Sequence, residues 1–169
     1  MLDPEELSAC AQSALDALRG SDPERARLAE RVLARAVDGG ISDPVDDVNV
    51  SLIRACLKAR TGDPSGAAGL AERAVSAARC LPEDETGRRL LVQALADLAD
   101  FRRVAGMPDV ENLLIEALQL SRNGLGENDP DTAPVWNSVG MNYRYRGRFD
   151  EAEAAYAAAL SAHRACGAL

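Results

Sequence analysis

The chain has 169 residues, 47% of them hydrophobic and 27% charged, with a formal net charge of −8. Its length suits one domain with a buried core, no apolar run approaches the roughly 18 residues of a membrane span, and the acidic start MLDPEELSAC is unlike a signal peptide. We therefore expect a cytoplasmic protein, and the negative charge disfavours general binding to nucleic acid or to anionic lipid. Lys58 is the only lysine among 19 basic residues, a bias that favours a bacterial source.

Helix start and stop signals alternate along the chain. Five of the eight prolines follow aspartate, whose side chain accepts hydrogen bonds from the free amides at a helix start, and proline suits the first helical position. Glycines stand at the matching ends, where a left-handed residue closes a helix. In chain order the predicted helices cover residues 4–19, 22–38, 44–61, 64–80, 83–105, 108–123, 131–146 and 149–166. No segment alternates as a strand does, so the predicted fold class is all-α with eight helices.

Short motifs recur at a spacing of about 42 residues. LAER at 28–31 returns at 70–73, and the offset between the second and third units is 43. One helix hairpin cannot bury its apolar face without a neighbour, so this period predicts a right-handed α-solenoid within a single domain, residues 1–169. The predicted hairpin units are approximately 4–40, 44–81, 83–124 and 130–166.

The fourth unit contains W-N-S-V-G-M-N-Y-R-Y-R-G-R-F-D-E-A-E-A-A-Y-A-A-A-L and resembles the tetratricopeptide repeat. The residues that carry the resemblance are Trp136, Val139, Gly140, Tyr143 and Gly147, followed by Ala152, Tyr156 and Ala159. Small residues at Gly140 and Ala152 let the two helices approach closely, and the aromatic side chains fill the space beside them. The preceding LGENDPDTA and the period resemble the longer variant found in kinesin light chains and in bacterial regulatory proteins of the NB-ARC type.

The resemblance implies that a second stripe on the first helix of each unit lines a concave groove. In the fourth unit this stripe is Asn137, Met141, Arg144 and Tyr145. With the offset of 42, the equivalent residues of the third unit are Leu95, Ala99, Arg102 and Arg103. With the further offset of 43, those of the second unit are Leu52, Cys56, Ala59 and Arg60. The candidate groove residues are therefore Arg60, Arg102, Arg103, Asn137, Met141, Arg144 and Tyr145. A row of arginines suggests a partner with a free carboxylate or acidic side chains, because guanidinium binds carboxylate bidentately. The alternative is internal pairing with Asp97, Asp100 or helix ends.

Other chemistry is weighed against this reading. Arg144, Arg146 and Arg148 with Tyr143 and Tyr145 could contact RNA, but Tyr143 belongs to the repeat core and the net charge opposes a polyanion. The carboxylates Asp150, Glu151 and Glu153 could serve acid–base chemistry, but they suit the positive end of the last helix dipole. His163 and Cys166 are one turn apart and could form a Cys-His pair. No C-x-x-C pair joins Cys10, Cys56, Cys80 and Cys166, so we expect no metal and no cofactor.

The sequence thus predicts a scaffold module, not an enzyme, that binds protein or peptide. The alternative is a sensor or oligomerisation module of a bacterial regulatory protein whose effector domain lies elsewhere. No polar capping helix follows the last repeat, so Tyr156 and Leu160 would face outward. This favours either a homodimer through the C-terminal hairpin or a chain that is part of a longer protein.

Overall fold

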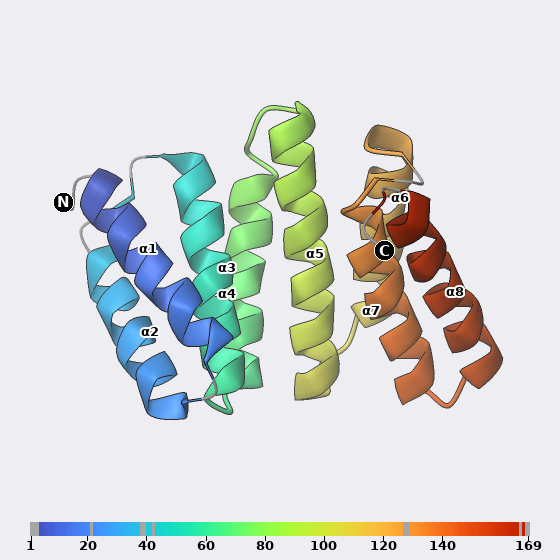
Figure 1. Cartoon of the computed structure of the whole chain (residues 1–169), viewed down its shortest axis with the longest axis horizontal. Helices are drawn as coiled ribbons and strands as arrows, with labels where there is room; N and C mark the ends of the chain where they lie inside the picture. Colours follow the sequence, from blue (N-terminus) through green and yellow to red (C-terminus); the bar gives the residue numbers. More distant parts are fainter. Residues whose placement is uncertain are drawn as a thin grey trace. The chain divides into compact units, whose positions relative to one another are not determined.

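The computed structural model describes residues 4–20, 22–37, 40–41, 43–126, 129–165 and 167, and this part of the chain is helical with short connections and no strand (Figure 1). In chain order its helices are α1 (Pro4–Arg19), α2 (Pro23–Val37), α3 (Pro44–Arg60), α4 (Pro64–Ala78), α5 (Glu85–Ala105), α6 (Val110–Gly124), α7 (Thr132–Tyr145) and α8 (Phe149–Ala165). Each predicted boundary lies within two residues of the observed one. The all-α class is confirmed.

Aspartate side chains cap at least four of these helices, three of them from the expected Asp-Pro pairs; Asp22 accepts a hydrogen bond from the amide of Glu24 at 2.9 Å. Asp43 accepts a hydrogen bond from the amide of Val45 at 2.7 Å, and Asp63 accepts one from the amide of Gly66 at 2.8 Å. Asp84, which no proline follows, does the same for α5 through the amide of Gly87 at 2.8 Å. Each cap satisfies an amide that has no partner within the first helical turn.

The chain divides into two compact units, Met1–Leu81 and Pro82–Leu169, each built from two helix hairpins. In the first unit α1 pairs with α2 and α3 pairs with α4, while α1 and α2 also pack against α3. Its buried core comprises Leu7, Ala14, Ala17, Ala26, Leu33, Val50 and Leu57. The predicted assembly of all four hairpins into one domain stays a prediction.

The second unit pairs α5 with α6 and α7 with α8, and α7 also packs against both α5 and α6 (Figure 1). Its core joins buried residues of all four helices, with partly buried aromatic side chains packed against them: Ala99, Val110, Leu114, Val139 and Ala155, with Trp136 and Tyr143. A Cβ atom built on Gly140 would lie 2.6 Å from Cε1 of Tyr156. The close approach of α7 and α8 therefore needs glycine at this position, as the repeat motif predicts.

Arg89 of α5 fixes the connection between α6 and α7. Its Nη1 lies 2.8 Å from Oδ1 of Asp129 and 2.6 Å from Oδ2 of Asp131, and its Nη2 lies 2.9 Å from Oε1 of Glu85. Asp129 is largely buried, with its side chain 10% exposed. Hydrogen bonds from Arg89 hold the pKa of Asp129 below its usual value, and the amide of Asp131 adds to the effect.

The repeat register differs from the predicted one by a residue in α5. Gly106 and Gly147 close α5 and α7 with left-handed backbone, φ 68° and 74°, and they are 41 residues apart, not 42. Gly62, with φ 86°, stands 44 residues before Gly106. Burial follows the same register: Val48, Val92 and Ala133 are equivalent buried positions. The predicted offsets of 42 and 43 residues were therefore wrong for the first helices, where the observed offsets are 41 and 44. The total distance across the two repeats agrees with the prediction.

Candidate peptide-binding face

With the corrected register, the α5 equivalents of the four α7 candidates are Ala96, Asp100, Arg103 and Val104. We call the resulting surface the α5/α7 face. It comprises Asp100, Arg103 and Val104 of α5 with Asn137, Met141, Arg144 and Tyr145 of α7. Leu95 and Ala99, which the sequence analysis assigned to this surface, are fully buried in the core instead.

Arg102 lies away from the α5/α7 face. In the corrected register it corresponds to Tyr143, a core position of the fourth repeat. Its Nη1 lies 3.4 Å from the carbonyl oxygen of Pro108 and 3.9 Å from Oδ2 of Asp109. Arg102 therefore contacts the connection between α5 and α6, and its expected position in the groove is corrected.

Arg60 belongs to the first unit, where it closes α1. Its two terminal nitrogens donate hydrogen bonds to the carbonyl oxygens of Leu18 and Gly20. The last carbonyls of a helix have no partner within the helix, so this arginine satisfies acceptors that otherwise need water. The guanidinium of Arg60 is thus already engaged within its own unit.

Arg103 makes one of the internal pairs that the sequence left open. Its Nη2 lies 3.1 Å from Oδ1 of Asp100, and its side chain is 13% exposed. The other carboxylate oxygen of Asp100 accepts a hydrogen bond from the hydroxyl of Ser138 at 2.8 Å. This chain of contacts joins α5 to α7 and fixes the orientation of both charged groups.

Asp97 precedes Asp100 by three residues on α5. It is half-buried, and within the described residues no cation pairs with it. Burial raises the pKa of Asp97 to about 7, the negative charge of Asp100 adds to the rise, and a hydrogen bond from Gln93 opposes it. The alternative pairing of an arginine with Asp97 is thus not seen in the described part of the chain.

The α7 half of the face is open to solvent. Asn137 and Arg144 are exposed, Met141 is half-buried, and Tyr145 is 69% exposed. Val104, the α5 equivalent of Tyr145, is 63% exposed. Arg144 makes no ion pair among the described residues, so the face ends in one unpaired guanidinium beside two exposed apolar side chains.

The neighbouring arginines in YRGRF are engaged differently. Arg146 lies 2.7 Å from Oε2 of Glu111, and Arg148 pairs with Glu151. The guanidinium of Arg148 also lies 4.4 Å from the ring centroid of Tyr143. Both arginines are paired with carboxylates and Tyr143 packs in the core, which disfavours the RNA patch weighed above. The ion pair with Glu151 also engages one of the carboxylates considered for acid–base chemistry.

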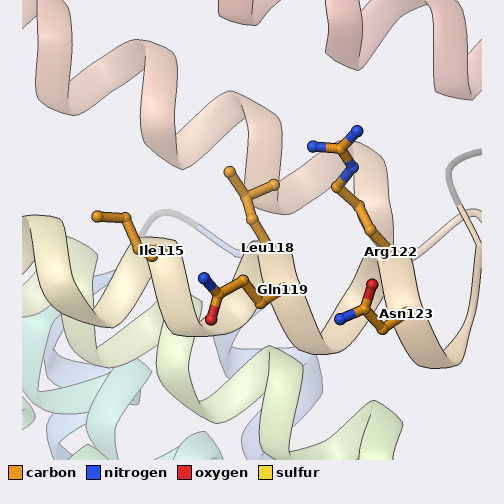
Figure 2. A pocket seen from close by; sticks show the side chains of 5 residues that line it. All are labelled: Ile115, Leu118, Gln119, Arg122 and Asn123. Carbon is orange, nitrogen blue, oxygen red and sulfur yellow. The ribbon is translucent and has the colours of Figure 1, made fainter.

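A shallow depression on α6 is lined by Ile115, Leu118, Gln119, Arg122 and Asn123. Figure 2 shows that all five side chains rise from this one helix. The described residues contain no group of three side chains that could hold a metal ion. None of the helices in the described ranges is long and apolar enough to cross a membrane. Cys166, the proposed partner of His163, lies outside the described residues.

Comparisons with known proteins agree with the repeat motif. Residues 90–165 match the family model for the tetratricopeptide repeat. Among solved structures the chain resembles BtubC (BKLC) from P. vanneervenii, with a TM-score of 0.67 and 20% identity over 95% of this chain and 73% of that one. No curated protein matches. Proteins of this repeat family generally act as non-catalytic scaffolds for protein–protein interaction. The repeat motif, the hairpin pairs and these likenesses together show an all-α solenoid fold in which residues 90–165 are similar to tetratricopeptide repeats.

Proposed function

We propose that the chain is a non-catalytic scaffold module that binds a peptide segment of a protein partner on the α5/α7 face. One observation carries the proposal: Arg144 is exposed, makes no ion pair within the described part of the chain, and is followed directly by the exposed Tyr145. Arginine and tyrosine are the residue types that contribute most to binding at protein interfaces. Both side chains rise from a helix whose opposite side is buried, so binding needs no ordering of the frame.

The proposed ligand group is a carboxylate, either a peptide C-terminus or an acidic side chain. Arg144 would donate two parallel hydrogen bonds to it. Arg103 is paired with Asp100 at 3.1 Å and so adds little net positive charge to the face. A charge-assisted hydrogen bond contributes about 1.5–3 kcal/mol, so loss of the contact should weaken binding roughly ten- to a hundredfold. We no longer include Arg60 and Arg102 in this role because other acceptors engage them.

A pull-down from the source cell, followed by mass spectrometry, tests the proposal. The wild-type chain should capture a protein that Arg144→Glu fails to capture. Arg25→Glu is the matched control, since Arg25 is also exposed and makes no ion pair among the described residues. Both variants should have unchanged thermal unfolding, because exposed substitutions usually alter stability by less than about 0.5 kcal/mol. Equal capture by Arg144→Glu and wild type would refute binding at this face.

A second candidate function is a sensor or oligomerisation module of a bacterial regulatory protein. Leu160 of α8 favours it: this side chain is 41% exposed, whereas its α6 equivalent Leu118 packs against the core of the second unit. A leucine that is exposed where the preceding repeat packs its equivalent leucine suits docking of a second copy, which would give a homodimer through the C-terminal hairpin. Sedimentation at micromolar concentration tests this, since Leu160→Glu should convert a dimer to a monomer. A wild-type chain that is already monomeric would exclude the dimer.

A further inference from the structure

We propose that α2 docks an acidic amphipathic helix of a protein partner. The apolar side chains of that helix pack on Leu28 and Val32. Its carboxylates bind Arg31 and Arg35. We call these four residues the α2 face. They belong to the first unit, whereas the α5/α7 face belongs to the second, so the inference goes beyond the proposed function and does not depend on it.

Two large apolar side chains of α2 are left uncovered by the helices packed against it. Leu28 is 55% exposed and Val32 is 44% exposed. Ala26 and Leu33 are fully buried in the core of the first unit, and at about 100° per residue they lie on the opposite side of α2 from Leu28. Leu28 and Val32 are four residues apart, so they are neighbours on the helix surface. Removing this apolar pair from water would favour the docking of a second apolar surface.

Unpaired positive charge borders this apolar pair. Arg31 and Arg35 are exposed, and neither makes an ion pair within the described part of the chain. The two carboxylates of α2 itself do not neutralise them, because Glu24 and Glu30 each pair with another arginine. The α2 face thus carries two positive charges on a chain whose formal net charge is −8. Electrostatic complementarity favours a partner that presents carboxylates to it.

A surface depression beside α2 has room for one of these carboxylates. It is formed by α2, the end of α3 and the turn before α4, and its lining residues are Glu24, Arg27, Glu30, Arg31, Lys58, Thr61 and Asp63. Lys58 pairs with Asp63 at 3.1 Å, and the three other charged residues apart from Arg31 are paired as well. A carboxylate that enters the depression can therefore bind Arg31 without displacing an existing ion pair.

A helix fits the α2 face better than an extended segment does. The four residues follow the spacing i, i+3, i+4 and i+7, so they form a stripe about 10 Å long on a convex helix surface. An extended peptide needs partners for its backbone amides and carbonyls, and the middle of a helix offers no free backbone groups. A helical segment satisfies its own backbone groups, and its side chains pack between those of α2. The matching stripe on the partner has apolar residues one turn apart with acidic residues beside them.

Three synthetic helical peptides of equal length test the inference, with fluorescence anisotropy and the full chain. The acidic peptide has a leucine stripe at helical spacing, bordered by glutamates, in an alanine background with blocked ends. The basic peptide replaces each glutamate by lysine, and the scrambled peptide keeps the composition of the acidic one but breaks its stripe. The acidic peptide should bind at least fivefold more tightly than either of the others, and its affinity should fall as salt is added.

Substitutions on the α2 face should weaken the acidic peptide. Arg31→Glu combined with Arg35→Glu should do so by about tenfold or more, because each exposed ion pair contributes up to about fivefold and reversal adds repulsion. Leu28→Ala should weaken it about five- to tenfold through lost apolar contact. Arg144→Glu, which changes an exposed arginine of the second unit, is the matched control and should leave this affinity unchanged. Arg31→Gln carries the same test if charge reversal disturbs the fold.

Several results would overturn the inference. No binding of the acidic peptide at about 1 mM, or equal binding of the basic or scrambled peptide, would show that α2 does not recognise an acidic amphipathic helix. If Arg144→Glu releases the acidic peptide and the α2 variants do not, the proposed function stands while this inference fails.

Two further measurements distinguish other occupants of the α2 face. Vesicles containing phosphatidylserine that bind wild type, but not the double arginine variant, would assign the face to a membrane if the acidic peptide does not bind. A dimer seen by sedimentation that Leu28→Ala dissociates would assign it to a second copy of the chain. Either result would overturn the docking of an acidic helix.

Discussion

Replacement of Arg89 by methionine should destabilise the second unit substantially. Methionine keeps the unbranched apolar stem but is shorter and lacks the cation that bonds Glu85, Asp129 and Asp131. Breaking a fully buried pair costs about 3–5 kcal/mol, whereas an exposed pair contributes about 0–1 kcal/mol. Asp129 is 10% exposed, but Glu85 is 73% exposed and Asp131 is 45% exposed, so the expected loss lies between these limits. We expect about 2–4 kcal/mol at neutral pH.

Chemical denaturation followed by circular dichroism measures this loss, and its pH dependence identifies the cause. Arg89 holds the pKa of Asp129 below its usual value, so the pair stabilises the folded state above the unfolded-state pKa, and the effect is lost as pH falls through the folded-state pKa. The difference between wild type and Arg89→Met should therefore shrink below about pH 4. In the Arg89→Met background, Asp129→Asn should recover part of the stability.

The matched control is Arg73→Met, which removes an arginine paired with Asp47 at 2.8 Å. These side chains are 51% and 25% exposed, so the expected loss is below about 1 kcal/mol. An Arg89→Met variant within about 0.5 kcal/mol of wild type at pH 7 would refute the role assigned to Arg89.

Three further predictions concern stability, each measured by denaturation. Gly140→Ala should cost about 1–3 kcal/mol because its Cβ would lie 2.6 Å from Tyr156, and a loss that Tyr156→Leu fails to relieve would contradict this. Asp97→Asn should become more stable relative to wild type as pH rises from about 4 to above 7. The pKa of Asp97 is raised in the folded state, so its contribution to stability is complete below the unfolded-state pKa and is lost as pH rises through the folded-state pKa. Parallel pH profiles of stability for the two proteins would contradict this. Arg54→Met should cost about 1–3 kcal/mol, since its ion pair with Glu30 is 3.1 Å long with both side chains 16% exposed, and a neutral effect would show that the pair contributes nothing.

The helices could be predicted because their end signals are local. Asp43 and Asp63 cap the helices that follow them through hydrogen bonds to nearby amides, which depend on two or three residues of sequence. Gly106 and Gly147 close α5 and α7 with left-handed backbone, which glycine adopts without strain. Boundaries set by such short-range contacts are visible in a single sequence.

The register of α5 could not be obtained from the repeat period. Gly106 precedes Ala117 of α6 by 11 residues, whereas Gly147 precedes the equivalent Ala159 of α8 by 12, so the first and second helices have different offsets. Matches such as Ala117 with Ala159 fall in the second helices, where the offset is 42, and they carry no information on the first helices. The observed offsets can be read from the glycine turns, because aligning Gly62, Gly106 and Gly147 gives them directly.

The engagement of the arginines depends on contacts between distant parts of the chain. Arg60 reaches the end of α1 from α3, and Arg103 is positioned by Asp100, which Ser138 contacts from another helix. The sequence identifies these side chains as basic residues on a helix face, but it does not show which acceptors lie within reach. Arg144 was selected from the sequence as a candidate residue, and its role stays a prediction.

The most direct test of the central claim is nuclear magnetic resonance of the labelled chain with its captured partner. Binding on the α5/α7 face should shift the signals of Val104, Met141 and Tyr145, and Arg144→Glu should abolish the shifts. Shifts confined to Ile115 and Leu160, on α6 and α8, would contradict the account and place the binding surface on those helices.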